Sequence, residues 1–131
     1  YPVKGKVEYV NYKKGKFMND KEIKLYEARA NIIKALAHPS RLFIVDMLNK
    51  QPRAVGELTE MIGADTSTVS KHLSVLKNAG IVEDEKKGTT VFYSLKTPCI
   101  LNFIGCIEDV IESNTKTQVE ILSCCRTRSA K

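Results

Sequence analysis

Apolar residues recur at helical spacing through the first half of the chain and predict four helices. The four segments are Asn19–Ala37, 39–50, 54–63 and 66–78. Pro39 suits the first turn of the second helix, which is mostly apolar and should therefore be central. Gly63 stands where a left-handed residue often ends a helix, and Asp65 is placed to cap the fourth helix. Two short helices joined by a tight turn with glycine are typical of a helix-turn-helix.

After Gly80 the apolar period changes from helical spacing to two. Residues 81–95 therefore predict a strand, a turn at Lys87 and Gly88, and a second strand. Thr97 and Pro98 then suit the N-cap and first position of a fifth helix, over 99–113. A last stretch, 117–125, could form a short helix before a basic tail. The predicted fold class is mainly α with a small β-hairpin (α+β).

Length and composition predict one soluble domain in a chain of 131 residues. No apolar run reaches the roughly 18 residues of a membrane span, and the start lacks a signal-peptide pattern, so we expect a cytoplasmic protein without a membrane partner.

We expect three segments. Residues 1–18 are a basic N-terminal arm or sequence added for expression, 19–115 the domain, and 116–131 a tail with cysteines. The net charge of +6 suits a polyanionic partner without proving one.

The fourth predicted helix has an unusual outward face. Val69, Leu73 and Leu76 fall within about 60° of one another and should be buried. The outward face presents short polar side chains and one cation, without the Glu–Lys pairs common on solvated helices. Such short donors and acceptors let a helix approach base edges closely. The candidate DNA contacts are Thr66, Ser67, Ser70, Lys71 and His72.

The tip of the predicted hairpin carries cations and hydroxyl groups that could lie on a phosphate backbone. Its candidates are Lys86, Lys87 and Thr89. The acidic run 83–85 nearly cancels this charge, so an ordinary charged turn is an equally good interpretation.

Three stretches together resemble the ArsR/SmtB family of winged-helix repressors. They are "KALAHPSRLFIVDML", "VGELTEMIGADTSTVSKHLSVLKNAGIV" and "KKGTTVFYSL", and the resemblance spans about residues 20–113. It implies a winged helix-turn-helix that forms a homodimer through the first and fifth helices. It also implies double-stranded operator DNA that is released when an inducer binds. The family's recognition-helix pattern falls on Thr66, Ser67, Ser70, Lys71 and His72.

The inducer must be inferred residue by residue. The family's C-x-C pair is absent from the third helix. Its Asp/His zinc set is also absent, since the only histidines are His38, at the helix junction, and His72. The remaining candidates are Cys99, Cys106, Cys124 and Cys125. They suit arsenite, antimonite or another soft metal ion, and, alternatively, oxidation or persulfide formation. A lone cysteine is also explained as a small buried apolar residue, and a terminal pair as uninvolved.

Helix geometry restricts how the cysteines can cooperate. Cys99 would be the second residue of the fifth helix, where free N–H groups favour a thiolate. Cys106 follows seven residues later, about 10.5 Å along the axis, whereas one ion needs its sulfur ligands within roughly 4 Å. Each would therefore need a thiol from the other subunit or from the tail.

Other function classes fit less well. A Gly-rich phosphate loop, a nucleophile constellation and a C-x-x-C motif are all missing, so we expect no enzyme. A winged-helix module that binds protein instead of DNA would present an apolar recognition face. Here that face is polar with Lys71, and only Val75 favours the alternative, so no protein partner other than a second copy is expected.

Overall fold

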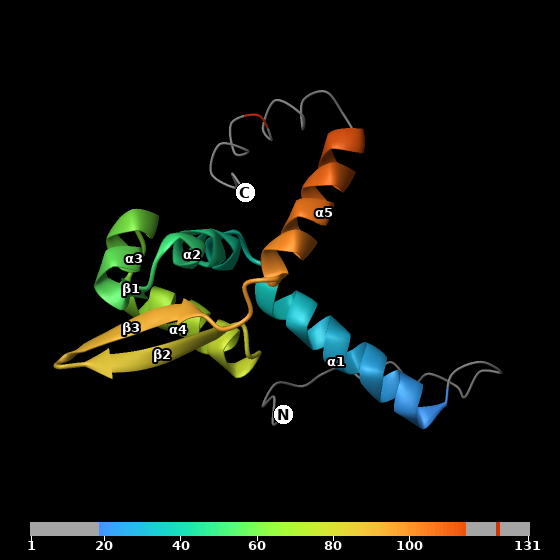
Figure 1. The fold of residues 1–131 in the computed structure, drawn as a ribbon, viewed down its shortest axis with the longest axis horizontal. Helices are drawn as coiled ribbons and strands as arrows, with labels where there is room; N and C mark the ends of the chain where they lie inside the picture. Colours follow the sequence, from blue (N-terminus) through green and yellow to red (C-terminus); the bar gives the residue numbers. More distant parts are fainter. Residues whose placement is uncertain (1–18, 115–122, 124–131) are drawn as a thin grey trace.

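The computed structural model describes residues 19–114 and residue 123. Along the chain follow α1 (Asp20–Leu36), α2 (Pro39–Lys50), β1 (Arg53–Ala54), α3 (Val55–Ile62), α4 (Thr66–Asn78), β2 (Val82–Lys87), β3 (Thr90–Leu95) and α5 (Ile100–Asn114) (Figure 1). The expected N-terminal arm, most of the expected tail and the Cys124–Cys125 pair lie outside the described residues. The first five predicted helices and the hairpin are present, in the predicted order, whereas the short helix predicted over 117–125 lies outside the described residues apart from residue 123.

The core lies between α2, α3, α4 and the sheet. Val69, Leu73 and Leu76 of α4 are completely buried, which confirms the predicted stripe. The buried apolar set is Ala35, Leu36, Ile44, Val45, Met47, Leu48, Leu58, Val69, Leu73, Leu76, Ile81 and Val82. Because α2 supplies four of these residues, it is the central helix, as its apolar sequence predicted.

The sheet has three antiparallel strands in the order β1-β3-β2. The sequence predicted only the hairpin, and it placed Arg53 between two helices and Ala54 at the start of the third, so β1 was missed. It pairs Arg53 with Tyr93 and Ala54 with Phe92. A strand of two residues is too short to show any period, and only its distant partner makes it a strand.

The hairpin turn lies one residue later than predicted. Lys87 pairs with Thr90, which leaves Gly88 and Thr89 as the loop. Gly88 has a φ of 65°, while no residue other than glycine has a positive φ among those described. A positive φ at the first loop position alone is the pattern of a type II′ turn, which favours glycine there.

The helix ends explain where each element stops. Asn19 caps α1 by accepting two backbone hydrogen bonds from its first turn. Gly63 ends α3 in the left-handed region at φ 73°, as predicted, and its N–H donates to the carbonyl of Thr59 at 2.9 Å. Asp65 does occupy the N-cap of α4, but its side chain makes no capping hydrogen bond.

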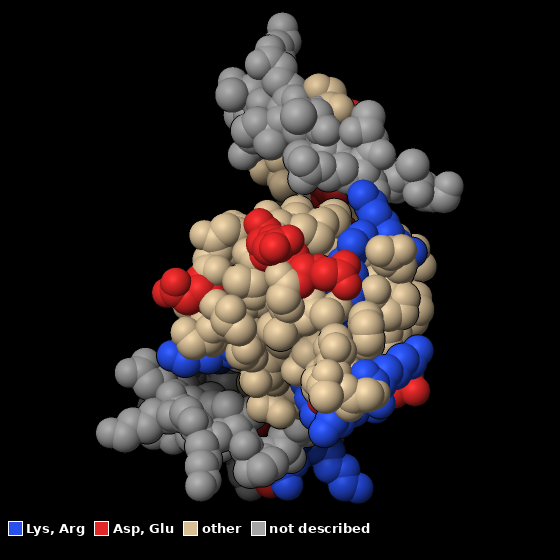
Figure 2. Space-filling model, turned by 90° about the vertical axis from the view of Figure 1, so that its left-hand side faces the viewer, with Lys and Arg blue, Asp and Glu red and all other residues tan. Residues whose placement is uncertain are grey.

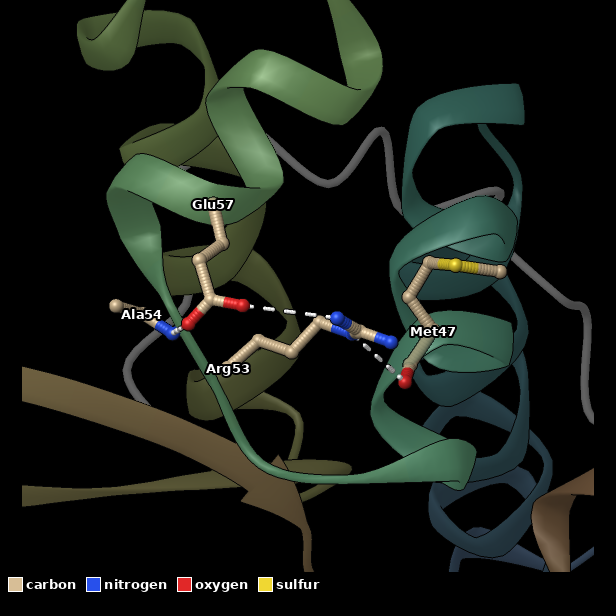
Figure 3. A network of polar contacts seen from close by, with 4 residues as sticks. All are labelled: Met47, Arg53, Ala54 and Glu57. Atoms are coloured by element: carbon tan, nitrogen blue, oxygen red, sulfur yellow. Dashed lines mark hydrogen bonds and ion pairs between the residues drawn. The ribbon is translucent and has the colours of Figure 1, made fainter.

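Arg53 fixes the start of α3 against α2 (Figure 3). Its Nε donates to the carbonyl of Met47 at 3.3 Å, and its Nη1 lies 3.6 Å from Oε2 of Glu57. The other carboxylate oxygen of Glu57 accepts the N–H of Ala54 at 3.3 Å. These contacts place the first helix of the helix-turn-helix relative to the central helix.

The two terminal helices project away from this body (Figure 1). Only Ala35 and Leu36 of α1 are buried, and no residue of α5 is. The predicted cap of α5 was wrong, because Thr97 Oγ1 donates to the carbonyl of Gly80 at 3.4 Å. Cys99 lies in a tight turn before the helix, which begins at Ile100. Within the part of the chain that is described, no helix is long and apolar enough to cross a membrane.

Candidate DNA interface

Ser67 and Lys71 of α4 lie opposite the buried stripe, and Thr66 and Ser70 lie on the flank between the two. Thr66, Ser67 and Lys71 are exposed and Ser70 is partly buried. The helix contains no acidic residue, so Lys71 is not paired within it. Hydroxyl groups and one cation are thus presented together on the outward side of α4, which we call the α4 face: Thr66, Ser67, Ser70 and Lys71.

The β2–β3 hairpin, which we call the wing, is joined to the end of α4 by an ion pair. Lys77 Nζ lies 3.0 Å from each carboxylate oxygen of Asp84 on β2. Part of the acidic run that precedes the wing tip is thus used to hold the hairpin beside α4. In the view of Figure 2, Lys and Arg gather mainly along the right-hand edge and the lower part of the described surface, and most of the visible Asp and Glu lie in its upper part.

The predicted wing contacts do not all face one way. Lys86, Lys87 and Thr89 are all exposed, at the tip of the hairpin. Successive residues of a strand point to opposite faces of the sheet, so Lys86 and Lys87 cannot both face the same surface. The Nζ atom of Lys87 lies 6.0 Å from the centre of the Phe92 ring. At most one of these lysines points with the α4 face.

His72 differs from the other candidates because it is partly buried and already has partners. Its ring lies 4.3 Å from that of His38, centre to centre, and its Nδ1 is 3.4 Å from Nη1 of Arg41. Burial lowers the pKa of His72, and the neighbouring His38 and Arg41 lower it further. Arg41 was missed by the sequence analysis, although a lone cation in the first turn of an otherwise apolar central helix was a usable signal.

The cysteines are separate in the described chain. Cys99 and Cys106 are both exposed and form no disulfide. No group of three potential metal ligands comes together anywhere in the described residues. A metal site built on these thiols therefore needs ligands from a second copy or from the tail.

The helices α1 and α5 leave a large apolar surface uncovered. Of the ten large apolar residues that are exposed within the described ranges, seven lie on these two helices: Leu25, Tyr26, Ile32, Ile33, Phe103, Ile107 and Val110. An open apolar groove runs between the helices, lined by Arg29, Ile32, Ile33, Leu36, Ile100 and Phe103. We call this surface the α1–α5 face.

Comparison with known proteins agrees with this architecture. Residues 38–84 match the family described as "Bacterial regulatory protein, arsR family". The HTH-type transcriptional regulator Rv0081 of Mycobacterium tuberculosis is 33% identical over 99 residues, which cover 75% of this chain and 87% of the relative. The chain belongs to the ArsR family. It is a DNA-binding transcriptional regulator, like its relatives, and not an enzyme.

Two further members of the family bear on its action. The transcriptional repressor SdpR of Bacillus subtilis is 33% identical over 82 residues, covering 57% of this chain and 91% of the relative. The solved structure of Mb0332 from Mycobacterium bovis is described as a homodimeric winged helix-turn-helix DNA-binding domain. It has a TM-score of 0.63 and 29% identity and covers 73% of this chain and 89% of that one.

Proposed function

We propose that this ArsR-family member is a repressor that binds operator DNA as a homodimer, with α4 as its recognition helix. The observation that carries the proposal is the α4 face, in which short hydroxyl side chains and Lys71 stand opposite a completely buried stripe. Repression is the activity named for the relative SdpR. Operator DNA of a repressor lies in the cytoplasm of a bacterium, so we place the protein there.

The proposed contacts divide into two groups by their chemistry. Short side chains on α4 can reach base edges in the major groove, where Lys71 suits a guanine. Exposed residues at the wing tip suit phosphates, which fix the orientation of the protein on the duplex. The base-reading candidates are Thr66, Ser67, Ser70 and Lys71 on α4, whereas His72 on the same helix already has partners within the protein. The phosphate candidates on the wing are Thr89 and one of the two lysines Lys86 and Lys87.

The proposed dimer forms through the α1–α5 face. Apolar surface of this extent is typical of an interaction site rather than of a surface left in water. A two-fold pairing buries the same face on both copies and places two recognition helices on successive half-sites. The neighbour Mb0332 is described as homodimeric. Residues 19–115 then form the complete DNA-binding and dimerisation domain, flanked by the arm 1–18 and the tail 116–131.

We propose that the inducer is a thiol-directed species, arsenite, antimonite or another soft metal ion, that acts at α5. Cys106 is exposed and follows Phe103 by three residues and precedes Val110 by four, so it shares their side of the helix. In the proposed dimer this thiol lies at the interface. A bond formed there changes the spacing of the recognition helices, and the further thiols come from Cys99 or Cys106 of the second copy or from Cys124 and Cys125 of the tail.

The DNA-binding proposal is tested with Lys71→Ala and with Lys24→Ala as a control, since Lys24 is also exposed but lies on α1. We expect Lys71→Ala to lower the affinity for a selected operator by about 1–3 kcal/mol and to relax preference at one base pair. Mobility shifts over a series of salt concentrations measure both effects. A loss of salt slope with intact sequence preference would make Lys71 a phosphate contact. Absence of salt dependence in the wild type would contradict DNA binding.

The inducer proposal is tested with Cys99→Ser, Cys106→Ser and the double variant, together with Cys124→Ser/Cys125→Ser. Operator release is titrated with arsenite, antimonite, cadmium, zinc and a persulfide donor in parallel. Loss of the response to arsenite but not to persulfide in the tail variant supports ion binding. A response to persulfide or oxidant alone supports redox sensing instead. Normal release from a folded Cys99→Ser/Cys106→Ser protein excludes the thiols at α5.

A further inference from the structure

Arg41 joins the end of α1 to the recognition helix. Its Nη2 donates to the carbonyl of Lys34 at 3.3 Å, and its Nη1 lies 3.4 Å from Nδ1 of His72 on α4. The Arg41 Nε is buried and has no hydrogen-bond partner among the described residues. A buried donor without a partner costs stability, so the guanidinium is held at this corner by its other contacts.

The guanidinium of Arg41 determines which nitrogen of the His72 ring carries the proton. Arginine can only donate hydrogen bonds, so the Nδ1 atom of His72 must accept, and its proton must sit on Nε2. The same logic applies to His38, whose Nδ1 accepts the N–H of Ser40 at 3.1 Å to cap α2. The two imidazole rings, tilted by 40°, are therefore both neutral in this arrangement.

We propose that His72 is a positioning residue. Its inner nitrogen, Nδ1, contacts Arg41 and so fixes the recognition helix against the corner between α1 and α2. The inference rests on the proposed role of α4 in DNA binding. It assigns to His72 a different task from the neighbouring Ser67 and Lys71, which face outward without such partners in the described structure. His72 then serves DNA binding through Arg41 rather than by reading a base.

This role has a definite dependence on pH. The groups whose charge acts on His72 are His38, from the junction before α2, and Arg41, from α2, and both oppose its protonation and lower its pKa after burial. A protonated ring donates from both nitrogens, so it loses the contact with Arg41 and places two cations together. Acidification should therefore weaken DNA binding through this residue. A histidine that touched a DNA phosphate would show the opposite sign, because its charged form would be favoured.

Two substitutions, each of which mimics one nitrogen of the His72 ring, separate the positioning role from base reading. The oxygen of an asparagine side chain reaches the place of the inner nitrogen Nδ1, and that of glutamine reaches the place of the outer nitrogen Nε2. His72→Asn thus keeps an acceptor for Arg41, and His72→Gln keeps a group directed outward. Both variants lack a titrating ring. His72→Phe, which keeps an aromatic ring beside His38 but no acceptor, serves as the matched loss-of-contact variant.

The experiment measures affinity by fluorescence anisotropy for an operator selected from random DNA with the wild-type protein, at about pH 7.5 and about pH 5.5. We expect His72→Asn within about threefold of wild type and His72→Gln and His72→Phe weaker by at least about tenfold. On acidification the affinity of the wild type relative to His72→Asn should fall severalfold, and by less than about tenfold, because the lowered pKa of His72 keeps part of the rings neutral at about pH 5.5. Circular dichroism and melting curves confirm that each variant is folded at both pH values.

The opposite pattern overturns the inference. If His72→Gln binds as the wild type and His72→Asn does not, His72 reads the DNA directly. A relative affinity of the wild type that stays level or rises on acidification likewise refutes the positioning role. A wild-type protein that selects no DNA sequence at all refutes the proposed function itself, so the two failures are distinguishable.

Discussion

Ile107→Glu is expected to separate the two copies of the proposed dimer. Ile107 is 41% exposed near the middle of α5, so its own chain covers only part of it. Full burial of such a side chain contributes roughly 1.5–3 kcal/mol, and the uncovered part is therefore worth about 1 kcal/mol. Two-fold symmetry doubles this loss to about 2 kcal/mol per dimer.

The introduced carboxylate adds a second penalty. Burying a polar group without a partner costs about 1–3 kcal/mol in each copy, even when the group takes up a proton. Together these effects weaken the dimer by at least about 4 kcal/mol, which raises its dissociation constant about a thousandfold. Because each recognition helix then acts alone, affinity for a two-fold operator should fall with the loss of the dimer.

Sedimentation equilibrium measures the dimer, and mobility shifts on the same samples measure DNA binding. Met61→Glu is the matched control, since Met61 is 43% exposed but lies on α3. Ile104 is a poorer position because it packs against the core of its own chain, so a charge there also affects folding. If Ile107→Glu dimerises as Met61→Glu does, or binds the operator tightly as a monomer, the α1–α5 face is not the functional interface.

Three further predictions concern the body of the domain. Gly63→Ala should destabilise the fold by about 1–2 kcal/mol, because the φ of 73° at Gly63 is left-handed. Gly56→Ala, on a helix with open space around it, should instead stabilise the fold by about 0.5 kcal/mol, and thermal or urea unfolding compares the two variants. Leu73→Ala empties a completely buried position and should cost about 2–5 kcal/mol in urea unfolding, so a loss below about 1 kcal/mol would contradict the packing of α4. A double-mutant cycle with Lys77→Met and Asp84→Asn should give a coupling energy for unfolding below about 1 kcal/mol, because both side chains are well exposed, and a larger value would mean that the wing is rigidly fixed to α4.

The recognition helix and its polar face were determined by the sequence. Val69, Leu73 and Leu76 repeat at helical spacing, so they fix which side is buried and which side carries Ser67 and Lys71. The end of α3 at Gly63 was equally local, since only a glycine tolerates that backbone conformation without strain. These features depend on neighbours within one or two turns, which the order of residues specifies directly.

Other features were decided only by tertiary contacts. Strand β1 exists because Arg53 and Ala54 meet β3, and Thr97 bonds to Gly80 instead of capping α5. His72 was grouped with the outward residues as a candidate DNA contact. Its contact with Arg41, thirty-one positions away, follows from the packing of α2 on α4. Spacing along one helix gives the direction of a side chain, whereas its partner and protonation depend on which other element is packed there.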